Sequence, residues 1–170
     1  YYQKNPSHYI MGMLLAKTFL HNKQFNEAAR ILDKIVVIPY EGATDGRGLY
    51  KETHLMLAVE AMKKNNYKKG ISEIALARQW PERLGVGKPY AEDIDERLEN
   101  FLLYQCYTKM GDKTKSESAL QQIKTNKANA YKINTVLSEW ANDNKAALDK
   151  IPAGLNGDEN ERVLAEWLRK

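Results

Sequence analysis

Apolar residues recur along this chain at the spacing of an α-helix. Leu14, Leu15 and Phe19 share one helical face, and Ala28 and Leu32 begin a second stripe after a polar turn. No segment shows the apolar–polar alternation between hairpin turns that marks β-strands. The pattern predicts an all-α fold, with helices near residues 7–22, 25–38, 50–64, 67–80, 92–110, 114–124, 127–142, 143–151 and 158–169.

The apolar pattern also repeats itself. Residues 24–39 align with residues 66–81 at an offset of 42, and a fainter third copy ends near residue 124. Each copy is predicted to form two antiparallel helices joined by a polar turn, and in the first two copies a proline stands where the second helix should end. The aligned pairs are Phe25 with Tyr67, Ala28 with Gly70, Leu32 with Ile74, Ile35 with Ala77, and Pro39 with Pro81.

These positions resemble the tetratricopeptide repeat, in which small and aromatic residues lie on the first helix, alanine begins the core of the second, and proline follows it. The matches are Leu15, Ala16, Phe19, Phe25, Ala28, Leu32 and Pro39, then Leu57, Ala58, Ala61, Tyr67, Gly70, Ile74, Ala77 and Pro81, then Leu103, Tyr104, Tyr107, Gly111, Asp112, Leu120 and Ile123. The family's tryptophan is replaced by Gly12, His54 and Asn100, and the spacing exceeds the usual ~34 residues.

The resemblance implies a right-handed superhelix of antiparallel helix pairs, with about three to four helical hairpins plus a C-terminal helix. We expect a single domain over residues 1–170. Its repeats are predicted near 8–39, 50–81 and 92–124, with a weak repeat at 127–151 and a terminal helix at 158–169.

The extra length of the repeats falls in two connectors, residues 40–50 and 82–90. Insertions at one place in a solenoid emerge on one edge, so we expect the connectors to lie side by side. The second connector contains Gly-Val-Gly-Lys, but a phosphate-binding loop needs an earlier glycine and a Ser or Thr after the lysine, where Glu82 and Pro89 stand here. We therefore expect a structured connector, which Trp80 and Leu84 attach to the helices.

The segment PERLGVGKP, residues 81–89, also resembles a connector in the C-terminal helical repeats of some large bacterial proteins. Those proteins carry an upstream β-sandwich domain similar to sugar mutarotases and are tied to carbohydrate handling. The resemblance implies that this chain is part of a larger bacterial protein, which its first residue, Tyr1, also fits. Both a cytoplasmic and an extracytoplasmic location fit the sequence.

Composition narrows the classes of function. The 26 basic and 22 acidic residues give a net charge of +4 and form no one-sided basic face, so we expect no nucleic-acid partner. No apolar run reaches the ~18 residues of a membrane helix, so we expect no membrane span. Ten Tyr, three Trp and three Phe are typical of a chain that folds around a core.

Candidates for catalysis or metal binding are few. Cys106 lies in an apolar helical run, which indicates a buried, inert thiol. The three histidines lack metal-ligand spacing, and His54 is interpreted as a hydrogen-bonded residue at the start of a helix. The acidic residues of 91–100 suit a solvated helix N-terminus. We expect no catalytic residue, metal or cofactor; a helical enzyme with its site at 92–96 is an alternative that needs a cleft.

The first helix of each hairpin is apolar nearly all round, so we expect its groove-facing side to be covered. The chain's own C-terminal helices are one candidate, with Trp140, Leu164 and Trp167 as anchors. An upstream domain and a partner helix are the others. A covered groove would leave a scaffold that acts through its connectors, whereas an open groove would form a receptor for a peptide or helix.

The sequence thus favours a non-enzymatic protein-interaction or scaffold module, whose partner is a protein or an upstream domain of the same chain. The alternative is an accessory module of a carbohydrate-active or glycan-binding protein, in which connector aromatics face solvent together and stack on sugar. The candidate contact residues are Tyr40, Arg47, Tyr50, Trp80, Arg83, Lys88 and Tyr90 around the connectors, and Met13, Lys17 and Met56 in the groove.

Overall fold

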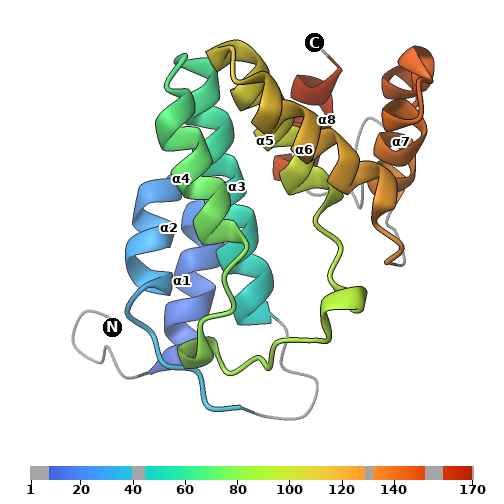
Figure 1. The fold of residues 1–170 in the computed structure, drawn as a ribbon. Helices are drawn as coiled ribbons and strands as arrows, with labels where there is room; N and C mark the ends of the chain where they lie inside the picture. Colours follow the sequence, from blue (N-terminus) through green and yellow to red (C-terminus); the bar gives the residue numbers. More distant parts are fainter. Residues whose placement is uncertain (1–7, 40–44, 129–131, 152–158, 170) are drawn as a thin grey trace.

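The computed structural model describes residues 8–39, 45–128, 132–151 and 159–169. Over these residues the chain is helical and contains no strand, which confirms the all-α prediction (Figure 1). The α-helices are α1 (Tyr9–His21), α2 (Phe25–Leu32), α3 (Asp45–Lys63), α4 (Tyr67–Ala77), α5 (Arg97–Met110), α6 (Lys113–Thr125), α7 (Lys132–Ala141) and α8 (Glu159–Leu168). Short 3-10 helices are η2 (Glu82–Leu84), η3 (Ala91–Asp93) and η4 (Lys145–Lys150).

Consecutive helices pack in pairs. α1 packs with α2, α3 with α4, α5 with α6, and α7 with η4, while α2 also lies against α3 and α4 against α5. Each pair is therefore a helical hairpin that stacks on the hairpin before it, as Figure 1 shows for the first three. This is the hairpin arrangement that the repeated apolar pattern predicts.

The four turns share one backbone geometry. A residue with positive φ comes first, and the N-cap residue of the next helix follows it directly. In two turns the cap side chain accepts a hydrogen bond from the first turn of the helix, which satisfies an otherwise unpaired backbone N–H group. The turn pairs are Lys23 with Gln24, Asn65 with Asn66, Gly111 with Asp112, and Asp143 with Asn144.

The end of α2 differs from the prediction. The helix ends at Leu32 and does not continue to residue 38, so Pro39 lies well beyond it. Residues 35–38 alternate in burial instead: Ile35 and Val37 lie inside, whereas the residues that follow each of them are exposed. This period of two belongs to an extended segment. Four consecutive β-branched side chains favour an extended backbone, because they lose rotamer freedom in a helix.

Three other boundaries are corrected by the structure. The predicted helix 92–110 is two elements, since η3 ends at Asp93 and α5 begins at Arg97. The predicted helix at 143–151 is the 3-10 helix η4. α3 begins at Asp45, so the second half of the first connector belongs to a helix.

The C-terminal helices cover the first helices of the second and third hairpins and part of α1, whose Ile10 and Leu14 stay exposed. α7 packs against α5 and α6, and its Trp140 meets Phe101 edge-on with ring centroids 4.9 Å apart. α8 contacts α1 and α3, and its Leu164 and Leu168 are buried in the same apolar cluster as residues of α3. Of the three occupants considered for the groove, the chain's own C-terminal helices therefore lie there.

Candidate functional site: the connector edge

The two connectors lie side by side, as their shared place in the repeat predicts: a Cβ on Gly46, in the described part of the first connector, would lie 3.2 Å from the Leu84 carbonyl oxygen of the second. The extended segment 35–38, which leads into the first connector, contacts the second connector as well. The backbone N–H of Val37 donates to the carbonyl oxygen of Arg83 at 2.7 Å, and Leu84 is buried with Val37 in one apolar cluster. Gly85 follows with a φ of 70°, and a Cβ there would lie 2.9 Å from the Val37 carbonyl oxygen. In Figure 1 the segment that follows α2 passes beside η2 at one end of the first two hairpins. Glycine is needed at this point of closest approach.

Arg47 attaches the second connector to α3. Its guanidinium donates to the carbonyl oxygen of Ala77, the last residue of α4, at 2.8 Å, and it lies 4.4 Å from the centre of the Trp80 ring. The side chain is buried, and burial lowers the pKa of Arg47 from its usual value, although the nearby Glu99 opposes the shift. The helix dipole favours a cation at the C-terminus of α4, and the indole face of Trp80 attracts the same cation.

Arg83 holds the second connector to the end of α2. It donates to the carbonyl oxygen of Leu32 and to the carboxylate of Asp33, both at 3.2 Å, and lies 5.6 Å from the Tyr50 ring centre. Tyr50 is buried inside α3 and stacks edge-on with His54 at 4.4 Å. Burial raises the pKa of the Tyr50 hydroxyl, with Asp33 adding to the shift. These contacts give the connectors a defined conformation.

The outer surface of segment 35–38 and of the end of the second connector is apolar and basic. Val36 is 65% exposed, Ile38 is 66% exposed and Tyr90 is 78% exposed. Lys88 is exposed beside Tyr90 in the chain. We call these four exposed residues, two on segment 35–38 and two at the end of the second connector, the connector edge.

The other sequence-predicted contact residues divide between surface and interior. Lys17 is exposed on α1 and Met13 is half-buried, whereas Met56 is buried between α1, α2 and α8. Tyr40 lies outside the described residues. The structure thus brings Arg47, Tyr50, Trp80 and Arg83 together as the support of the edge. Of the groove residues, Met13 packs against the apolar cluster that contains Tyr50, whereas Met56 belongs to a separate cluster.

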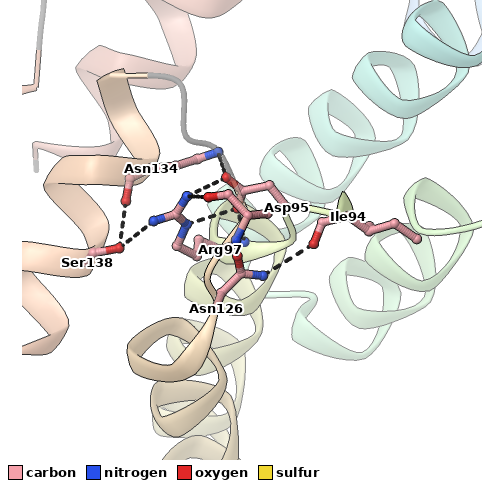
Figure 2. A network of polar contacts seen from close by, with 7 residues as sticks. Ile94, Asp95, Arg97, Asn126, Asn134 and Ser138 are labelled. Carbon is pink, nitrogen blue, oxygen red and sulfur yellow. Dashed lines mark hydrogen bonds and ion pairs between the residues drawn. The ribbon is translucent and has the colours of Figure 1, made fainter. Parts of the chain in front are cut away.

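A buried polar network joins α5 to α7, and sequence reasoning missed it (Figure 2). Arg97 donates to both carboxylate oxygens of Asp95, at 3.0 and 2.6 Å, and to the Ser138 hydroxyl at 2.7 Å. Asn134 of α7 donates to the same carboxylate at 2.8 Å. Burial alone would raise the pKa of Asp95, but these hydrogen bonds and the Arg97 charge hold it below its usual value. Arg97 also donates to the carbonyl oxygen of Ala128 at 2.9 Å.

Three further polar residues lie inside the hairpins; the burial of Glu99 and Asn100 was missed, whereas His54 was expected to be hydrogen-bonded but at the start of a helix. Glu99 is buried and pairs with Lys51 of α3, so this carboxylate is not part of a solvated helix start. His54 lies within α3 and contacts Glu73 of α4 at 2.8 Å, and Asn100 accepts from Arg78. A signal for the last two was present: His54 and Asn100 recur at the same position of the repeated apolar pattern.

The described residues form no group of His, Cys, Asp and Glu side chains arranged to hold a metal ion. Burial raises the pKa of the Cys106 thiol to about 11, so the nucleophilic thiolate is scarce at neutral pH. In the part of the chain that the structure describes, the helices are too short or too polar to cross a bilayer. No family model, curated protein or solved structure matches this chain.

Proposed function

We propose that this chain is a non-enzymatic helical-repeat scaffold that binds a protein partner through the connector edge. The observation that carries the proposal is a set of apolar side chains that stand in solvent on a fixed backbone. Val36 and Ile38 are exposed, while Val37 between them is buried and its backbone is hydrogen-bonded to the second connector. A surface that is already ordered loses little conformational freedom when a partner covers it.

The composition of the edge indicates the kind of partner. Two aliphatic residues and Tyr90 supply apolar contact, Lys88 supplies a positive charge, and the exposed Lys34 stands two residues before Val36 in the sequence. Protein interfaces commonly combine such a centre with a charged rim that selects the partner. We therefore expect a protein surface with apolar side chains and acidic residues around them.

The covered groove supports binding at the edge over binding in the groove. α8 contacts both α1 and α3, and Met56 is buried beside it. A partner helix would have to displace α8 before it reached Met56. Lys17 is exposed and stays a candidate contact.

We further propose that the hairpins are of the tetratricopeptide class and belong to a larger bacterial protein, whose upstream domain is one candidate partner. The small residues at the repeat positions support the class. Ala16, Ala28 and Ala58 are fully buried, and a Cβ on Gly70 would lie 3.0 Å from the Met62 side chain. Helices that cross this closely need small residues at the contact.

Sugar binding by the connector aromatics is less favoured. Stacking needs several rings that face solvent together, but Tyr50 is buried and Trp80 lies beneath the Arg47 guanidinium. Of the described connector aromatics, Tyr90 alone is exposed. A single ring is a poor platform for an extended glycan.

The test is affinity capture with an altered edge. The wild-type chain is compared with a Val36→Glu/Ile38→Glu variant and with a Ser72→Glu/Ser118→Glu control. Both variants carry substitutions at exposed positions, which should leave the fold intact. We expect quantitative mass spectrometry of a host extract to find a protein that the edge variant retains at least about tenfold less than the other two. Equal capture by all three chains would remove the edge as a binding surface.

A further inference from the structure

The repeats allow the same helix position to be compared three times within one molecule. Leu14 of α1 corresponds to Met56 of α3 and to Leu102 of α5, one at each first helix. Leu14 is 55% exposed, whereas Met56 is 4% exposed and Leu102 is fully buried. A position that is apolar in three copies and covered in two is uncovered in the first.

The later copies show what covers this position. α2 packs against α3, and Met56 shares a buried cluster with Phe25 and Ala28 of α2. α4 packs against α5 in the same way, and Leu102 shares a cluster with Ile74. In both cases the second helix of the preceding hairpin meets the first helix of the next. α8 also contributes, because Val163 packs against the Met56 cluster.

The uncovered side of α1 is a continuous stripe. Ile10, Leu14, Lys17 and His21 recur at the spacing of one helix face, and all four are exposed. α8 contacts α1 yet leaves this stripe in solvent. The end face of a helical array is normally polar, because nothing stacks on it. Here its centre holds two of the large apolar side chains that are exposed in the described chain.

We propose that the open face of α1 receives the second helix of a further helical hairpin, which extends the array on its N-terminal side. The chemistry of that helix follows from α2 and α4. It carries a small residue between two larger apolar residues, as Ala28 stands between Phe25 and Leu32, and an acidic side chain within reach of Lys17. This surface is separate from the connector edge, and the inference goes beyond the proposed function.

The test supplies such a hairpin from the chain itself. In a tandem protein, residues 1–42 are repeated ahead of Tyr1, which preserves the 42-residue offset and places a copy of α2 before α1. Leu14→Glu is then made in the single chain, in the original α1 of the tandem, and in the added α1 copy. The measurement is the midpoint of urea unfolding followed by circular dichroism. The added copy provides a matched control, because its Leu14 lies on the new open end.

We expect Leu14→Glu to leave the midpoint of the single chain nearly unchanged and to lower it clearly in the original α1 of the tandem. That shift should approach the one that Met56→Glu causes in the single chain. The substitution in the added copy should again have little effect. An equally small effect at both tandem positions would overturn the proposal, as would an added hairpin that stays unfolded. A dimer of the single chain that Leu14→Glu abolishes would assign the face to a second copy instead, and would also overturn it.

Discussion

The Asp95–Arg97 network should make a large contribution to stability that one substitution can remove. Asp95→Ala deletes the carboxylate that Arg97 and Asn134 both contact, while the guanidinium stays buried. Arg97 then retains the Ser138 hydroxyl and the Ala128 carbonyl oxygen as partners. Neither of these carries a charge, so the positive charge is no longer neutralised inside the protein.

The expected decrease in the free energy of unfolding follows from the cost of leaving the Arg97 charge buried without a negative partner. Removing one member of a buried ion pair costs about 3–5 kcal/mol, and the two remaining acceptors place Asp95→Ala near ~3 kcal/mol. With a urea dependence of about 2 kcal/mol per molar, the unfolding midpoint should fall by roughly 1.5 M. Equilibrium urea unfolding, followed by circular dichroism, measures this shift.

Asp149→Ala is the matched control, since it removes the same group from an exposed site on η4 and should change the free energy of unfolding by less than ~0.5 kcal/mol. A loss below about 1 kcal/mol for Asp95→Ala would refute the reasoning. It would mean that solvent reaches the guanidinium and that the network does not hold α7 against α5 in solution.

Because of the same carboxylate, we expect the stability of the folded chain to depend on pH. Its pKa is lower in the folded chain than in the unfolded chain, so its contribution is fully present above the unfolded value, near 3.9 for Asp, and is lost as the pH falls through the folded value. The stabilisation by such a carboxylate begins to fall below about pH 5. As the pH is lowered from there, the wild-type chain should therefore lose more stability than Asp95→Asn, which has no carboxylate to protonate. Parallel curves of unfolding midpoint against pH for the two proteins would contradict this.

Three further outcomes are expected. Gly85→Ala should cost about 1–3 kcal/mol in urea unfolding, because its φ is positive and the Val37 carbonyl oxygen is too close, whereas Gly87→Ala, with open space around it, should not; equal effects would argue against the connector contact. Cys106 should react with a thiol reagent at pH 8 only after unfolding, since its pKa is raised to about 11, and rapid labelling of the native chain would contradict its burial. Leu164→Ala should cost about 2–5 kcal/mol, because the side chain is buried where α8 joins the core; a negligible effect would show that α8 is not docked.

The helical pairs were predictable because their signals are local. Apolar spacing marks the helices, and the polar turns around Lys23, Asn65 and Gly111 mark where the chain reverses, whereas the turn at Asp143 was predicted as the start of a helix. The repeat added long-range information, since one shared insertion site was enough to predict that the two connectors lie together. The extended segment 35–38 was missed because its four β-branched residues were read as the end of a helical stripe.

The buried polar residues could not be recovered from local pattern. Asp95 and Glu99 lie in an acidic run that also suits a solvated helix start, and only their partners distinguish the two environments. Glu99 pairs with Lys51 of α3, far away in sequence, and Asp95, although it pairs with the nearby Arg97, is also held by Asn134 of α7. Periodicity identifies which residues avoid water, but it does not identify which charge meets which.

The contact between α8 and α1 has a consequence for how the chain folds. In an open solenoid each hairpin contacts only its neighbours, so folding can proceed along the chain one repeat at a time. Here the last helix returns to the first across roughly 140 residues, which makes the final closure a long-range step of high contact order. During synthesis, at about 5–20 residues per second, the first hairpin would wait on the order of ten seconds for α8. Throughout that interval the groove side of α1 and α3 stays accessible to chaperones and to other helices.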